Sequence, residues 1–198
     1  MVLQQSGGPG IADAERVAER ALVEKAQRGD REAFGELVRQ SMRRAYYVAL
    51  GLVGSPDDAL DLSQDAFVRA FAARHTLDPE RPFYPWYYQI LRRRCFNFLR
   101  DSKLHREKLA TESPWIVADA NQKVQTPERE AELKELRQRL QTAIDTLPDH
   151  EREVFVLREY DGLRYREIAD LVGIPQGTVM SRLYSARRRL ANELGEQR

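Results

Sequence analysis

The sequence has little of what catalysis, disulfide crosslinking or membrane insertion requires. Its one cysteine, Cys95, excludes an internal disulfide and a cysteine-based zinc site. Its three histidines are scattered without metal-ligand spacing, and there is neither a glycine-rich phosphate loop nor a nucleophile elbow. No signal-peptide pattern and no run of about eighteen apolar residues occurs. We therefore expect a cytoplasmic protein that is not an enzyme and has no cofactor or metal.

Patterns typical of β-strands are also missing. No run of alternating β-branched residues is bounded by turn signals, whereas apolar residues recur with helical period in nearly every segment. With 42% hydrophobic and 32% charged residues, the composition is that of a soluble globular protein. We predict an all-α fold with helices near residues 12–28, 31–53, 57–73, 83–102, 127–146, 149–159, 164–171 and 175–194.

The periodicity fails between residues 103 and 126, where Pro114 and polar residues interrupt it. We interpret this segment as a flexible linker between two small helical domains, residues 12–102 and 127–198. The glycine-rich residues 1–11 are expected to be a disordered lead. Trp115, Ile116 and Val117 are unusual in a solvated tether, so part of the linker is expected to lie on another surface.

The formal net charge of +1 conceals a strong sorting of charge along the chain. Between Ala45 and Val68 the only charged residues are four aspartates: Asp57, Asp58, Asp61 and Asp65. Arginines and lysines instead crowd residues 92–106 and 182–189. One acidic and two basic surfaces indicate two kinds of partner, a basic protein surface and nucleic acid.

The segment 165–190, YREIADLVGIPQGTVMSRLYSARRRL, predicts a helix-turn-helix. Gly173 permits a sharp turn, and Pro175 is compatible with a first helical turn. The second helix leaves polar and cationic side chains outside its apolar stripe, without a carboxylate, as a DNA-reading helix requires. The alternative is a solvated pair of surface helices. The predicted DNA-facing residues are Gln176, Thr178, Ser181, Arg182, Ser185, Arg187 and Arg188.

The segment 81–104 places several aromatic residues directly before a cationic helix. Aromatic rings that stack on unpaired bases, next to arginines that hold phosphates, are typical of single-stranded DNA binding. We assign possible nucleotide contacts to the loop 74–82, Tyr84 and Tyr87, and packing to Trp86. The alternative is that these aromatic rings fill the core.

Taken in order, the motifs resemble a sigma-70 family RNA polymerase sigma factor of the extracytoplasmic-function (ECF) group. DALDLSQDAFVRAF, residues 58–71, looks like the family's polymerase-docking helix. FYPWYYQILRRRCFNFLR, residues 83–100, is similar to the segment that opens and reads the promoter's −10 element. Residues 147–190 are similar to the domain that binds the −35 element.

This resemblance implies roles for individual residues. It implies docking on the clamp helices of the largest core subunit by Asp61, Leu62, Gln64, Asp65 and Phe67. It implies −10 contacts by Tyr84, Tyr87, Arg92, Arg93, Asn97 and Arg100, and −35 contacts by the helix-turn-helix residues named above. Family members commonly have Asn in place of Arg93 and Asp in place of Asn97, so the −10 preference does not carry over.

The implied function is that of a transcription initiation factor. Core RNA polymerase and promoter DNA would be its partners, an anti-sigma factor is a further candidate, and the polymerase would supply the active site and its magnesium. The chief alternative is a helix-turn-helix regulator that does not associate with polymerase. An adaptor that mimics polymerase-binding surfaces is a second alternative, although it would have no need for a DNA-reading helix.

Overall fold

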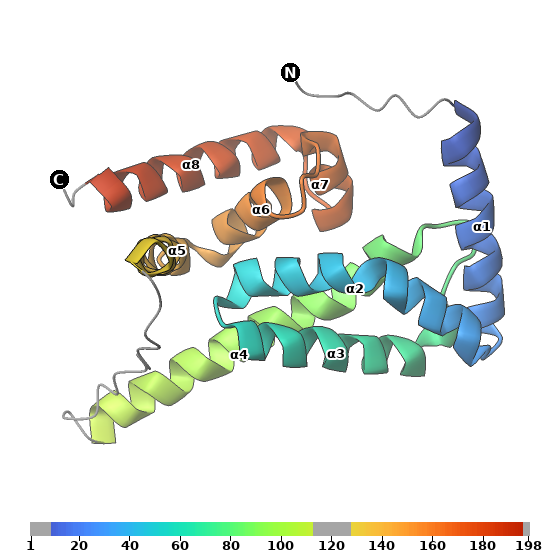
Figure 1. Ribbon diagram of the computed structural model, residues 1–198, viewed down its shortest axis with the longest axis horizontal. Coiled ribbons are helices and arrows are strands. Elements are labelled where there is room, and N and C mark those ends of the chain that lie inside the picture. Colours follow the sequence, from blue (N-terminus) through green and yellow to red (C-terminus); the bar gives the residue numbers. More distant parts are fainter. Residues whose placement is uncertain (1–8, 113–127, 196–198) are drawn as a thin grey trace.

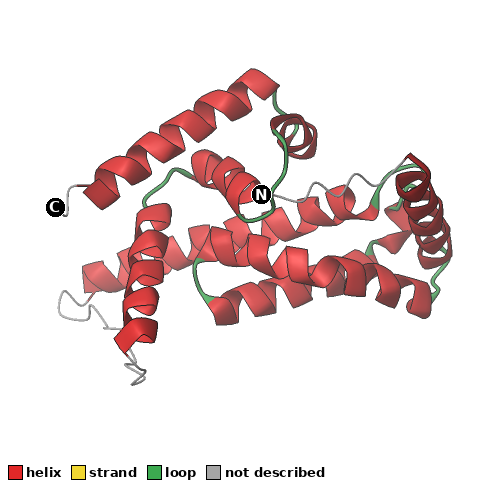
Figure 2. Cartoon of the chain, turned by 45° about the horizontal axis from the view of Figure 1, so that its top comes forward, coloured by secondary structure: helices red, strands yellow, loops and turns green. Residues whose placement is uncertain are grey.

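The computed structural model describes residues 9–112 and 128–195, and every regular element within these ranges is a helix (Figure 2). This confirms the all-α prediction. The elements are α1 (Pro9–Gln27), α2 (Arg31–Val53), α3 (Pro56–Ala72), the short 3-10 helix η1 (Arg74–Thr76), α4 (Phe83–Glu112), α5 (Glu128–Asp145), α6 (Asp149–Glu159), α7 (Tyr165–Val172) and α8 (Gln176–Gly195).

Two helix ends differ clearly from the sequence-based expectation. Helix α1 begins at Pro9, inside the expected lead, and α4 continues to Glu112 instead of ending at residue 102. The α4 extension, KLHREKLATE, is composed largely of good helix formers and has neither glycine nor proline before Pro114. The rest of the expected linker, with Trp115, Ile116 and Val117, lies outside the described residues.

Local signals fix several helix boundaries as the sequence predicts. The Ser55 hydroxyl accepts a hydrogen bond from the Asp58 amide at 3.3 Å and caps α3, whose first turn carries Asp57 and Asp58 near the positive end of the helix dipole. Gly173 ends α7 with φ of 77°, a left-handed conformation that suits glycine. The turn of the helix-turn-helix therefore forms as expected.

The helices form two bundles. Helices α2, α3 and α4 pack lengthwise and α1 crosses one end of them; we call α1–α4 the N-terminal bundle (Figure 1). Its core includes Leu37, Leu52 and Leu91, together with Cys95, whose thiol pKa is raised to about 12 by burial. Helices α5–α8 form the C-terminal bundle, in which α6 and α7 pack against α8.

The two bundles are in direct contact. Helix α6 lies against α2, and α8 lies on the far side of α6 (Figure 1). One hydrophobic cluster joins buried residues of α1–α4 to Val156, Leu157 and Leu171 of the C-terminal bundle. Among the described residues, no helix combines the length and apolarity that a membrane crossing needs.

Side chains of the C-terminal bundle pack directly on the α2 backbone at Gly51. A Cβ atom at this position would lie 2.8 Å from Cγ1 of Val156, closer than carbon atoms pack. Gly51→Ala should therefore force α6 away from α2 and destabilise the protein by about 1–3 kcal/mol relative to Gly35→Ala. Gly35 is the matched control, because its Cβ would meet only the Arg39 guanidinium at 3.7 Å. Urea unfolding of both variants provides the measurement, and equal stability of the two would contradict this packing.

Candidate nucleic-acid interface and docking surface

A buried carboxylate connects the two bundles. Glu153 of α6 is only 1% exposed and points at α4, where it accepts hydrogen bonds from the Tyr88 hydroxyl at 2.7 Å and from Arg92 Nη2 at 2.9 Å. Arg92 Nε makes a further close contact with the same carboxylate. Burial, and after it the Glu153 charge, raise the pKa of Tyr88 well above its usual value, so this hydroxyl stays protonated and donates.

Other contacts between the bundles are also polar. Arg44 of α2 forms a two-pronged ion pair with Asp161 at 2.6 and 2.8 Å, and Gln89 of α4 donates to the Leu171 carbonyl at 2.7 Å. Arg152 is buried and donates to the Leu52 carbonyl near the end of α2 and to the Asp145 carbonyl at the end of α5. A cation at two helix C-termini is favourably placed, because both dipoles present their negative ends to it.

Tyr84 and Tyr87 lie in the core and not on the surface, contrary to the expected base stacking. Tyr87 is fully buried, its ring stacks on Phe67 at 4.1 Å, and its hydroxyl donates to the Ser63 carbonyl. Tyr84 is 6% exposed and lies beneath the guanidinium of Arg44. Helical spacing brings both rings toward α2 and α3. The alternative stated above, that these aromatic rings fill the core, is therefore the correct one.

Other predicted −10 residues do lie together. Arg93 and Asn97 of α4 line a groove of about 520 Å³ with Arg69 and His75. Ile90, Arg94, Ala72 and Ala73 complete the lining of this groove. Arg100 is exposed and pairs with its neighbour Asp101, whereas Arg92 points away from the groove to Glu153. The groove thus combines cations with the ring and aliphatic surface on which an unpaired base can stack.

The predicted docking helix α3 divides into a core face and an outer face. Leu62 and Phe67 are each 7% exposed and pack into the N-terminal bundle, so they support the helix and do not offer a docking surface themselves. Asp65 forms ion pairs with Arg69 at 2.8 Å and with Arg94 at 2.5 Å. The hydrogen bond from Arg69 is the main cause of the lowered pKa of Asp65.

The outer face of α3 combines apolar and polar groups. Leu60 and Val68 are 46% and 69% exposed, and Asp61 and Gln64 lie exposed between them. Leu60, Asp61, Gln64 and Val68 follow one another at steps of one, three and four residues, so they share one side of the helix. An exposed apolar pair with a carboxylate between its members is suited to a partner that is both apolar and basic.

Helix α8 presents its polar side away from the rest of the molecule. Gln176, Ser181 and Arg188 are exposed as predicted, while Thr178, Arg182 and Ser185 are half-buried along its flanks. Arg187 is exposed but pairs with Glu159 at 2.7 Å, and Arg189, another candidate phosphate contact, pairs with Glu151 at 3.0 Å. All seven predicted DNA-facing positions lie outside the buried stripe of Val179, Leu183, Ala186 and Leu190.

Some surface residues escaped the sequence reasoning although a signal was present. Tyr184 is 67% and Met180 is 52% exposed on α8. Leu60 and Val68 are similarly exposed on α3. Each is apolar and lies off the hydrophobic stripe of its helix, which marks a residue exposed for contact with a partner. Glu153 gave no such signal, because in sequence it belongs to an ordinary acidic stretch.

The comparisons with known proteins agree with this layout. The sequence matches two family models, Sigma-70 region 2 over residues 37–104 and Sigma-70, region 4 over residues 137–190. It is 31% identical to the ECF RNA polymerase sigma-E factor of Haemophilus influenzae, over 91% of this chain and 97% of that protein. It is 32% identical to the protein of the same name from Escherichia coli, over 91% of this chain and 96% of that protein.

Solved structures show the same fold. The structure of CnrH in complex with the cytosolic domain of CnrY matches with a TM-score of 0.68 and 25% identity, over 91% of this chain and 99% of that one. The sigma factor RpoE of Bartonella quintana, in complex with the anti-sigma factor NepR, matches with a TM-score of 0.57 and 24% identity, over 83% and 98% of the two chains. The second likeness concerns the fold alone.

The network around Glu153 predicts a measurable loss of stability. Glu153→Gln keeps the size of the side chain but removes the charge that Arg92 and Tyr88 bind, and should cost about 2 kcal/mol of unfolding free energy, as for hydrogen bonds to a charged group. Glu36→Gln is the control: it breaks the exposed pair with Arg39 and should change the stability little, because solvent screens an exposed pair. Urea unfolding tests both, and a Glu153→Gln cost no larger than the control would show that the network contributes nothing.

Proposed function

Because the chain belongs to the ECF group of the sigma-70 family and directs RNA polymerase to promoters, we propose a division of work among its surfaces. The outer face of α3 docks on core polymerase. The groove beside α4 reads and holds the opened −10 strand, and α8 binds the −35 element. The N-terminal bundle is then the docking and −10 unit, and the C-terminal bundle is the −35 unit.

Docking by α3 is supported by the chemistry of its outer face. Leu60 and Val68 supply apolar area whose burial is favourable, and Asp61 supplies a charge that orients a basic partner. Asp65 holds α3 to α4 through Arg94, so its role is to couple the docking helix to the −10 surface. We therefore assign direct contact with the clamp helices to Asp61 and Gln64, and a supporting role to Asp65, Leu62 and Phe67.

Recognition of the −35 element by α8 is supported by its exposed polar side. Side chains near the N-terminus of a recognition helix, here Gln176, Thr178 and Ser181, are the ones that reach base edges, whereas cations farther along reach phosphates. Arg182 and Ser185 lie next to them, and Arg188 is the exposed cation of the following turn. Tyr184 adds an exposed ring that can contact a thymine methyl group or the sugar backbone.

Stabilisation of the opened −10 strand is supported by the groove of Arg93 and Asn97. An extruded base costs a few kcal/mol of lost stacking, and contacts in a protein pocket worth about 1–3 kcal/mol per base offset much of that cost. His75 and Ile90 supply the stacking surfaces there, in place of Tyr84 and Tyr87. Arg93 supplies a long, charged donor in the groove, so we expect the −10 preference of this protein to depend on it.

Engagement of a whole promoter requires the two bundles to separate. Elements centred about 25 base pairs apart lie on the order of 80 Å from each other along B-DNA, at about 3.4 Å per base pair. We infer that bundles held together through Glu153 and Arg92 do not reach both elements at once. Arg92, a predicted −10 contact, is paired with Glu153 in the closed arrangement, and separation would free its guanidinium for phosphates.

The interface between the bundles is suited to such opening because, beside its hydrophobic cluster, it holds several buried polar contacts, and one of its buried polar groups has no partner. Among the described residues, the buried Tyr84 hydroxyl has no hydrogen-bond partner, a cost of about 1–3 kcal/mol that water would relieve on opening. The likeness to CnrH in its complex with CnrY extends over both bundles. We therefore propose that the closed arrangement is a silent state, which an anti-sigma partner would hold and core polymerase would open.

The experiment that tests this function is run-off transcription with purified core polymerase and a promoter library. Asp61→Arg should abolish transcription and co-purification with core enzyme, because charge reversal opposes a basic partner, while the melting temperature stays unchanged. Glu36→Arg on the neighbouring helix α2 is the matched reversal and should leave both readouts intact. Normal co-purification of the Asp61→Arg variant would refute docking by this face.

A further inference from the structure

Helix α1 holds the loop that leads into the −10 helix. This α3–α4 loop, residues 77–82, is fixed at three points along one side of α1. Gln27 Nε2 donates to the Leu77 carbonyl at 2.7 Å, and Arg20 pairs with Glu80 at 3.1 Å. The Glu19 carboxylate accepts from the Phe83 amide at 3.0 Å. These contacts lie at the beginning, the middle and the end of the loop.

The contact of Glu19 with Phe83 supplies something that α4 lacks. Helices begin with a Ser, Thr, Asp or Asn whose side chain binds the free amides of the first turn, but Arg81 and Pro82 precede α4. Glu19 brings a carboxylate to that helix N-terminus from a different helix, which also suits the helix dipole. The start of α4, which has Pro85 in its first turn but no capping side chain directly before it, is therefore completed by α1.

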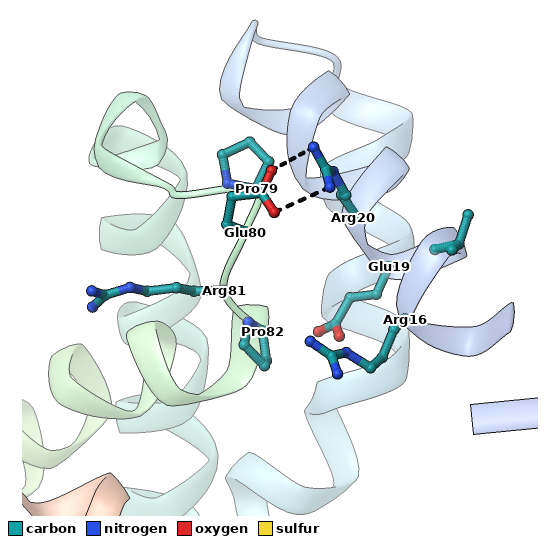
Figure 3. A pocket seen from close by; sticks show the side chains of 8 residues that line it. Arg16, Glu19, Arg20, Pro79, Glu80, Arg81 and Pro82 are labelled. Atoms are coloured by element: carbon teal, nitrogen blue, oxygen red, sulfur yellow. Dashed lines mark hydrogen bonds and ion pairs between the residues drawn. The ribbon is translucent and has the colours of Figure 1, made fainter. Parts of the chain in front are cut away.

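The other side of the loop faces α4 and, in the closed arrangement, α7. Figure 3 shows Arg20 bridged to Glu80 and Glu19 directed at Pro82, whereas Arg81 points away from α1. The Arg81 side chain is 82% exposed. Arg81 lines a cavity of about 350 Å³ with Trp86 and Gln89 of α4 and with Asp170 and Leu171 of α7. The Trp86 indole donates to Thr76 just before the loop. A shift of the loop on its α1 side would move these groups together.

The anchoring of α1 is stable enough to fix this geometry. Val23 and Ala26, which lie on the same side of α1 as Glu19 and Gln27, are fully buried in the core of the N-terminal bundle. The Gln27 contact with Leu77 and the Glu19 contact with Phe83 are both partly buried. The region 2 match begins at residue 37, so it assigns no role to α1.

We propose that α1 is a positioning element for −10 recognition, in which Glu19 and Gln27 set the α3–α4 loop and the first turn of α4 for contact with the opened strand. This inference rests on the proposed −10 role of α4 and its groove. Neither residue touches DNA; each acts through the backbone that it holds.

The test uses the full chain assembled with core polymerase on a promoter. Glu19→Met and Gln27→Met remove the polar groups but keep side-chain length, and each should reduce permanganate-detected opening about two- to tenfold, as expected for loss of one hydrogen bond. Both should also lower the preference for the intact −10 element over a substituted one. Glu19→Gln retains an oxygen acceptor and should open the promoter like the unmodified protein. Glu24→Gln, in the exposed pair with Arg20 on the same helix, is the matched control.

Three results would overturn the positioning role. They are unchanged opening and −10 preference in both Met variants, equal loss in Glu19→Gln and Glu19→Met, and a loss of opening that only parallels a fall in core binding and melting temperature. Arg81→Ala and Arg93→Ala distinguish a failure of the positioning role of α1 from a failure of the proposed −10 function. If they impair opening while the α1 variants do not, only the role of α1 fails; if they too leave opening unchanged, the −10 assignment itself fails.

Discussion

The interaction on which the arrangement depends is the burial of Glu153 between the two bundles. A carboxylate at 1% exposure is tolerable only when it is compensated, and its compensation, Arg92 and the Tyr88 hydroxyl, comes entirely from α4. If α4 moved away while the site stayed dry, Glu153 would be left as a buried charge without a partner. If water entered instead, the interface would open. If the bundles separate as proposed, the pair has two states, a closed one with direct ion pairing and an open one in which both groups are solvated.

This arrangement links regulation to DNA binding through the same side chain. Arg92 is one of the cations expected to contact the −10 region, and in the closed state Glu153 takes the place of a DNA phosphate beside it. The groove of Arg93 and Asn97 and the outer faces of α3 and α8 are lined by other residues and do not depend on Arg92. The closed protein can therefore present its docking helix to polymerase before its promoter-binding surfaces are spread apart.

Much of the fold could be predicted from the sequence because it depends on local physics. The period of the apolar residues located the helices, Ser55 and Gly173 marked boundaries, and the polar side of α8 was identified correctly. The errors concern choices made by tertiary contacts. Tyr87 could stack on a base or on Phe67, and only the packing of α3 against α4 decides for the core. Likewise Glu153 and Glu19 act on helices distant in sequence, at separations of 61 and 64 residues, so no local pattern reveals their partners.

The central claim is that the free protein is closed and that promoter engagement separates the bundles. Spin labels at two exposed sites, Arg39 on α2 and Ala191 on α8, allow the distance between the bundles to be measured by pulsed electron resonance. The closed arrangement predicts one narrow distance distribution for the free protein and a clearly longer distance in the complex with core polymerase and promoter. A broad distribution in the free protein, or an unchanged one in the complex, would contradict the account.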